Sequence, residues 1–230
     1  MRYRSQIIFG LVVAMDIIGI AANIPLLHYV AKPLLLPVLI VYCQTGALDK
    51  VTIGKWYILA GLFFSFLGDV FLLFEDRNAL FFILGLVCFL ATHIFYIIYF
   101  LKIRSGNISL VRKQPLLPIL VIAYGVSLVW LLYPHLGDLT IPVMVYAAVI
   151  CTMLISSMHV FFKVNHPANW YFLCGALLFV VSDSLLAINK FYTAFSFAGV
   201  WIMLSYCAAQ YFIVTGFIKQ TTHEQSPTVS

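Results

Sequence analysis

Long runs of apolar residues, separated by short polar breaks, make up most of this chain. They lie at residues 7–24, 31–48, 56–74, 79–101, 115–133, 141–162, 170–188 and 195–218. Most of them reach the roughly 20 residues that an α-helix needs to cross a bilayer, and they are too long for barrel strands. Backbone groups in lipid must hydrogen-bond within the chain, which leaves helices as the remaining option. The pattern predicts an all-α integral membrane protein with about eight transmembrane helices.

The two ends of the chain differ from this pattern. Arg2 and Arg4 precede the first apolar run, as in a signal peptide. The run continues towards Ile24 and further spans follow, so we expect a retained helix rather than a cleaved leader. We therefore expect a single transmembrane domain at 1–218, followed by a polar and disordered tail at 219–230.

Composition agrees with lipid as the main solvent. The 230 residues are 63% hydrophobic and 9% charged, with a mean hydropathy of +1.05, whereas about a quarter of a soluble domain is charged. The five cysteines lie inside apolar runs without CxxC or zinc spacing, so we interpret them as small buried side chains and expect no metal. No strongly basic arm indicates nucleic acid as a partner.

The placement of the basic residues predicts an orientation. With the N-terminus inside, the outer face carries only Lys32, Arg77 and Lys190. The inner face then carries ten basic residues: Arg2, Arg4, Lys50, Lys55, Lys102, Arg104, Arg112, Lys113, Lys163 and Lys219. Since cytoplasmic loops are enriched in Lys and Arg, this bias predicts that both termini are cytoplasmic.

The chain also resembles itself at an ungapped shift of 114 residues. This shift aligns Trp56 with Trp170, Gly61 with Gly175 and Asp69 with Asp183. Paired Trp, Gly and Asp are informative in so apolar a sequence, although the earlier helices of each half match poorly. We infer two parallel four-helix repeats, at about 1–112 and 113–218, related by a pseudo-twofold axis along the membrane normal.

Asp69 and Asp183 are the main candidates for chemistry. Each lies 13 residues beyond a tryptophan, on helices that run from inside to outside, which places both about 20 Å into a core of about 30 Å. Two neighbouring carboxylates in a low dielectric rarely both ionise, so one should keep its proton beside a charged partner. Such a pair suits acid-catalysed hydrolysis. Each aspartate could instead bond a neighbouring helix for structure, but its cost in lipid favours function.

Other polar residues could reach the same site. Lys32 could hold a lipid phosphate or could extend to the headgroups, and Tyr146, its repeat equivalent, could donate a hydrogen bond or lie in the aromatic belt. His93 and Gln210 are central in the fourth and eighth helices. A histidine at this depth is a functional candidate, although a packed, hydrogen-bonded one is as common. Asp16 has no repeat equivalent and is a weaker candidate.

A set of short segments resembles a known family. They are Lys32-Pro33, FSFLGDVFLL around Asp69, GLVCFLATHIFY, VMVYA, ALLFVVSDSLLA around Asp183, and YCAAQ with Tyr206. In this order they are similar to the YhhN-like lysoplasmalogenases, which are eight-helix membrane proteins. GxSxG, HExxH and P-loop motifs are absent, so serine hydrolase and metalloprotease interpretations lack support.

The resemblance implies an enzyme that hydrolyses the vinyl-ether bond of lysoplasmalogens, giving a fatty aldehyde and a glycerophospho-ethanolamine or -choline. It places the paired catalytic aspartates on Asp69 and Asp183 and implies no cofactor. We expect the lysophospholipid to be bound by five further residues: Lys32, His93, Tyr146, Tyr206 and Gln210. One aspartate would give the proton and the other would stabilise the cation, without a choice between them.

Two other classes of protein remain open. A proton-coupled transporter of small molecules or lipids would also use two parallel halves and intramembrane carboxylates. A scaffold or sensor would use the aspartates for structure. The partners expected in every case are the bilayer and, for the enzyme, its lysophospholipid, and the oligomeric state is undetermined. A bacterial inner membrane is the expected location, since no organelle retention signal is present.

Overall fold

The computed structural model describes residues 2–47, 53–103 and 109–223, so Lys50 and Arg104 lie outside the described residues. Its elements in chain order are α1 (Arg2–Ala21), α2 (Pro25–Gly46), α3 (Ile53–Leu72), α4 (Ala79–Ile103), α5 (Leu110–Lys113), α6 (Leu116–Leu132), η1 (Tyr133–His135), η2 (Gly137–Leu139), α7 (Thr140–Val160), α8 (Ala168–Ala187), η3 (Ile188–Tyr192) and α9 (Ala198–His223). Eight helices in the described residues are long and apolar enough to span a membrane. The predicted fold class is confirmed at this level.

Two helix boundaries differ from those expected. α2 begins at Pro25 rather than near residue 31, because proline suits the first turn of a helix, where its missing N–H is not needed. α9 continues to His223, so residues 219–223, expected in the disordered tail, are helical. The rest of that tail lies beyond the described residues.

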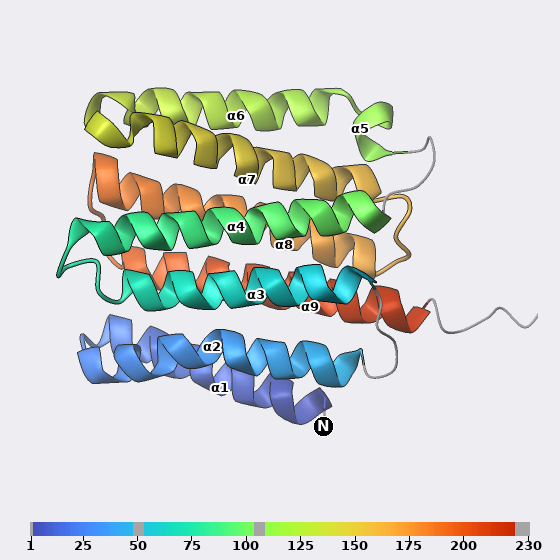
Figure 1. Ribbon diagram of the computed structural model, residues 1–230, viewed down its shortest axis with the longest axis horizontal. Coiled ribbons are helices and arrows are strands. Elements are labelled where there is room, and N and C mark those ends of the chain that lie inside the picture. The colour runs from blue at the N-terminus through green and yellow to red at the C-terminus, as the bar shows by residue number, and fades with distance from the viewer. Residues whose placement is uncertain (1, 48–52, 104–108, 224–230) are drawn as a thin grey trace, which may run out of the picture.

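The eight spans lie side by side with their axes aligned (Figure 1). α1 begins and α9 ends at the same end of the bundle, which we call the terminal end. The turns from α1 to α2, α3 to α4 and α8 to α9 lie at the opposite end, which we call the distal end. α6 forms one edge of the bundle, and α1 and α2 form the other.

Close helix pairs hold the centre of the bundle together. α3 packs on α4, and α8 packs on α9. A Cβ added at Gly61 would overlap the ring of Tyr96, and one added at Gly175 would lie 3.1 Å from the carbonyl oxygen of Ala209. Small residues let membrane helices approach closely, where packing rather than the hydrophobic effect drives association. The aligned glycines of the proposed repeat thus occupy comparable contacts.

The neighbours of the two halves also correspond. α2 packs on α3 and on α9, while α7 packs on α8 and on α4. The outermost helices differ, because α1 packs on α2 and α9, whereas α6 packs mainly on α7. The internal repeat stays a prediction, and the exposed edge at α6 departs from it.

Aromatic side chains fill the bundle towards its terminal end. Tyr99 lies with its ring centroid 5.6 Å from that of Phe172 and 5.7 Å from that of Phe217, and Phe100 lies 5.4 Å from Phe172. All four side chains are almost fully buried. This packing closes the interior on one side, so the polar cavity described below opens towards the distal end.

Candidate active site

A cavity of about 550 Å³ lies within the distal half of the bundle. Helices α1, α2, α3, α4, α8 and α9 contribute to its walls, together with Asn23 between α1 and α2 and Asn189 in η3. Asp69 and Asp183 both line it. The two aspartates that the sequence aligned at a shift of 114 therefore face one shared space.

Asp69 projects from α3 and is 1% exposed. Its Oδ2 accepts a hydrogen bond of 2.8 Å from the hydroxyl of Tyr206 on α9, which also lines the cavity. The ring of Tyr206 packs edge-on against Phe89 and Phe179, with centroids 5.7 Å apart in both pairs. The phenol is thus held in one orientation, and it fixes the carboxyl group of Asp69.

Asp183 projects from α8 and is held by a different set of partners. The hydroxyl of Tyr146 on α7 donates a hydrogen bond of 2.5 Å to its Oδ2. Nε2 of His93 on α4 lies 3.7 Å from the same oxygen. His93 is fully buried, and neither ring nitrogen has a hydrogen-bond partner within the described residues.

The two carboxyl groups face the cavity separately. Among the described residues, no hydrogen bond joins Asp69 to Asp183. Each uses Oδ2 for its tyrosine, and neither Oδ1 takes a hydrogen bond from the described part of the chain. One free carboxyl oxygen per aspartate is therefore available to a bound molecule.

Lys32 lies deeper than its place beside Pro33 suggested. Because α2 begins at Pro25, Lys32 stands two turns inside the helix rather than at its end. It is 8% exposed, lines the cavity and makes no ion pair with a described residue. Lys32 therefore lines the same cavity as the two aspartates, and its role in holding a lipid phosphate stays a prediction.

Three of the expected substrate-binding residues do not line the main cavity. Tyr146 and His93 lie behind Asp183, on the side away from the cavity. Gln210 lies one turn from Tyr206, accepts a 2.7 Å hydrogen bond from Tyr96 and donates one of 2.7 Å to Ser65. Its amide is therefore committed to a network that joins α3, α4 and α9.

A pair formed by a partly buried histidine and a buried aspartate, inside the rim of the cavity, was not predicted. Nδ1 of His28 on α2 lies 2.7 Å from Oδ1 of Asp16 on α1, and His28 lines the cavity. Asp16 is 1% exposed, and its Oδ2 has no hydrogen-bond partner among the described residues. The sequence did contain an indication of this contact, since Asp16 and His28 lie on either side of the tight turn between α1 and α2, at similar distances from it.

Two acidic residues stand at the outer rim. Glu75 and Asp76 line the mouth of the cavity in the turn between α3 and α4. Lys190 donates a 2.9 Å hydrogen bond to Glu75, which ties this turn to η3. The rim is thus acidic, while a lysine and a histidine lie further inside.

These features define an integral multi-pass membrane protein with two carboxyl groups in a polar cavity inside its helical bundle. The chain belongs to the YhhN family, whose family model matches residues 27–217. It is 34% identical over 170 residues to lysoplasmalogenase TMEM86A of Bos taurus and 33% identical over 170 residues to that of Homo sapiens, covering 70% of this chain and 65% of each relative.

A bacterial relative also bears the name lysoplasmalogenase. The chain is 35% identical over 143 residues to the lysoplasmalogenase of Mycobacterium bovis, covering 59% of this chain and 51% of that protein. The matched region thus spans just under two thirds of the length of the mammalian relatives and about half of the mycobacterial one. No solved structure matches the chain.

Proposed function

We propose that this protein hydrolyses the vinyl-ether bond of lysoplasmalogens, releasing a fatty aldehyde and a glycerophospho-ethanolamine or -choline. The observation that carries the proposal is the presence of Asp69 and Asp183 in one cavity, each with a free carboxyl oxygen. Relatives that bear the name lysoplasmalogenase in mammals and in a bacterium support it.

The chemistry of the bond explains the need for two carboxyl groups. A vinyl ether is cleaved when a proton is added to the carbon that is not bonded to oxygen, which leaves an oxocarbenium ion on the other carbon. Water then adds to that carbon and loses a proton, and the hemiacetal formed breaks down to the aldehyde and the free glycerol hydroxyl. One carboxylic acid can give the first proton, and one carboxylate can stabilise the cation and orient the water.

The surroundings of the two aspartates favour one division of these roles. Lys32 and Asp69 line the same cavity, and an ammonium near a carboxyl group favours its carboxylate form. Asp183 has neutral Tyr146 against Oδ2, and its free Oδ1 can carry a proton. We therefore assign Asp183 as the acid, and Asp69 as the carboxylate that faces the oxocarbenium ion.

The remaining charges suit a zwitterionic headgroup. Lys32 and His28, the latter oriented by Asp16, can bind a phosphate inside the cavity. Glu75 and Asp76 at the rim can attract the ammonium group of ethanolamine or choline. From the rim inwards, the cavity carries first acidic and then basic residues. The headgroup carries its ammonium at its end and its phosphate behind it, so the two orders of charge are complementary.

Replacing each aspartate in turn tests the proposal. In purified protein in detergent, Asp69→Asn and Asp183→Asn should each lower aldehyde release by roughly 10²-fold or more, the scale of acid–base catalysis. Asp138→Asn is the matched control, since Asp138 is exposed and lies away from the cavity. Thermal unfolding of each variant reports whether it is folded.

Two results would contradict the proposal. Full activity in either aspartate variant would exclude the scheme of two carboxyl groups. If the unmodified protein releases no aldehyde from lysoplasmalogens in detergent, the enzyme is excluded, and a transporter that uses the aspartates as a proton relay becomes the better explanation. Turnover in detergent, where no proton gradient exists, would show that hydrolysis does not depend on such a gradient.

A further inference from the structure

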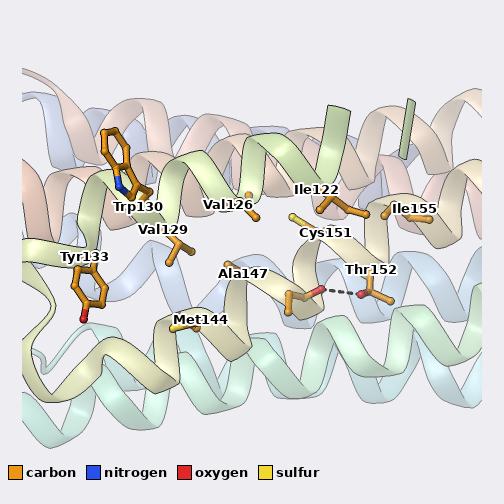
Figure 2. Close-up of a pocket in the computed structure, with 12 residues that line it drawn as sticks. Ile122, Val126, Val129, Trp130, Tyr133, Met144, Ala147, Cys151, Thr152 and Ile155 are labelled. Atoms are coloured by element: carbon orange, nitrogen blue, oxygen red, sulfur yellow. Dashed lines mark hydrogen bonds between the residues drawn. The ribbon is translucent and has the colours of Figure 1, made fainter. Parts of the chain in front are cut away.

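A second and larger cavity lies on the opposite side of Asp183, between α6 and α7. It measures about 700 Å³ and is lined by twelve residues of these two helices and of η1 (Figure 2). Trp130 and Tyr133 lie at one end, and Ile122 and Ile155 lie at the other. We call this cavity the α6–α7 groove. It extends about 16 Å along α6, from residue 133 to residue 122, at 1.5 Å per residue.

The lining of the groove is chemically suited to an alkyl chain. It contains no charged residue. The hydroxyl of Thr152 donates its proton to the carbonyl of Ala148 at 2.7 Å, and Cys151 donates to the carbonyl of Val121 at 3.7 Å. Since these polar groups already have partners within the helices, the groove presents an apolar surface to what binds there.

A small, separate cavity, which we call the passage, lies between the groove and the aspartate. The passage, of about 40 Å³, shares Gly125, Val129, Ala147 and Cys151 with the groove and also reaches Asp183. Asp183 in turn lines the polar cavity of about 550 Å³. Asp183 is therefore common to the polar cavity and to the passage from the groove.

The passage is closed by contacts that are few and local. A Cβ added at Gly125 would lie 2.7 Å from Sγ of Cys151, so α6 and α7 nearly touch at this point. The hydroxyl of Tyr124 donates a 2.8 Å hydrogen bond to Oγ of Ser184, the residue after Asp183. α6 is also the least buried of the eight spans. A small outward movement of α6 would widen the passage.

We propose that the α6–α7 groove binds the hydrocarbon chain of the lysoplasmalogen, which enters sideways from the bilayer. The headgroup then occupies the polar cavity, the vinyl ether lies at Asp183, and the chain runs through the passage into the groove. This inference rests on the proposed function and adds the site of the chain. Because lipid is as apolar as the groove, the groove adds little affinity and instead sets chain direction and length.

Closing the passage tests the inference. Gly125→Leu would place a side chain against Cys151 and block the path, and Ala147→Leu is a second, milder variant on the facing helix. Gly10→Leu is the matched control, since a Cβ at Gly10 on α1 meets no atom within 4 Å. Turnover is compared for two lysoplasmenylethanolamines, one with a long alkenyl chain and one with a chain of a few carbons.

The expected result is a change in chain preference. Both passage variants should lose long-chain turnover by on the order of tenfold or more while the short-chain substrate is hydrolysed nearly as before, since steric discrimination in apolar pockets has about this size. Gly10→Leu should leave both rates unchanged. If the passage variants keep long-chain turnover, or lose both substrates equally while still folded, the chain does not use the groove.

Photolabelling gives a readout that does not depend on turnover. The probe is lysophosphatidylethanolamine with a diazirine at the end of its chain, added to protein in nanodiscs. Adducts that excess unlabelled lysolipid competes away should map to α6 and α7 in the parent and in Gly10→Leu, and should decrease in Gly125→Leu. Competed adducts on other helices would overturn the inference. Failure of hydrolysis with groove labelling intact would instead count against the proposed function alone.

Discussion

At the scale of single residues, one pair of positions distinguishes the two aspartates. Lys32 and Tyr146 align at the shift of 114 residues. Tyr146 donates a hydrogen bond to Asp183, and Lys32 lines the same cavity as Asp69. A phenol at one position and an ammonium at the other would let two aligned carboxyl groups take different protonation states in one cavity.

Removing the charge of Lys32 should change the pH dependence of catalysis. In Lys32→Met, the carboxylate of Asp69 loses its neighbouring cation and takes up a proton more readily. Activity should fall near neutral pH and recover as pH rises, so the acidic limb of the pH–rate profile moves to higher pH. Lys190→Met is the control, since Lys190 pairs with Glu75 at the rim. An unshifted profile in Lys32→Met would contradict the assigned role of Asp69.

The residues of the cavity were predicted only in part. Lys32, Asp69, Asp183 and Tyr206 line it, as buried polar groups in lipid are expected to face an interior site. Gln210 is committed elsewhere, and the pair of Asp16 and His28 was not predicted. These details depend on the rotation of each helix about its axis, and helices that are apolar on all sides encode that rotation weakly.

At the scale of elements, the length and apolarity of the sequence runs predicted the eight spans well. The boundaries differ mainly where local chemistry decides them, as at Pro25, which begins α2, and at η3, a π-helical turn that continues α8 to Tyr192. A hydropathy pattern does not report such turns, since it measures composition and not hydrogen bonding. Contacts between helices depend instead on small residues, of which Gly61 is the clearest case.

Filling the contact at Gly61 should destabilise the bundle. Gly61→Leu places a side chain where the ring of Tyr96 lies, so α3 and α4 must separate. Overpacking of this kind costs about 1–3 kcal/mol, and the midpoint of thermal unfolding in detergent should fall by several degrees. Gly10→Leu, on the exposed side of α1, should leave the midpoint unchanged. An equal fall in both variants would show that the contact is not specific.

At the scale of the whole molecule, the polar cavity opens at one end of the bundle and the apolar groove at one side. α6 contacts the rest of the bundle mainly through α7, whereas α1 is packed on both α2 and α9. The first helix of each proposed half, α1 or α6, is thus covered by its neighbours to a different extent. Hydropathy alone does not predict this difference, because the mean hydropathy, 1.7 for the first span and 2.2 for the span at Leu116–His135, records composition and not contacts.

The orientation in the membrane stays a prediction that labelling can test. Single cysteines at Asp76→Cys, at the distal end, and Lys163→Cys, at the terminal end, are introduced into a variant that lacks the five native cysteines. In intact cells an impermeant maleimide should label position 76, and it should label position 163 only after permeabilisation, because Lys and Arg are enriched on the cytoplasmic side. The reverse pattern would place the mouth of the cavity in the cytoplasm.

The depth of Lys32 has a consequence for how the protein is made. A lysine two turns inside a helix raises the free energy of insertion, by at most the about 2.5–3.5 kcal/mol of a charge at the helix centre, and α2 also carries Pro33 and Pro37 within its length. α2 is therefore expensive to insert alone, and its charge is compensated once α3 brings Asp69 into the bilayer. The residues that form the cavity thus link the second and third spans during biogenesis, so that stable integration of α2 waits for synthesis of α3.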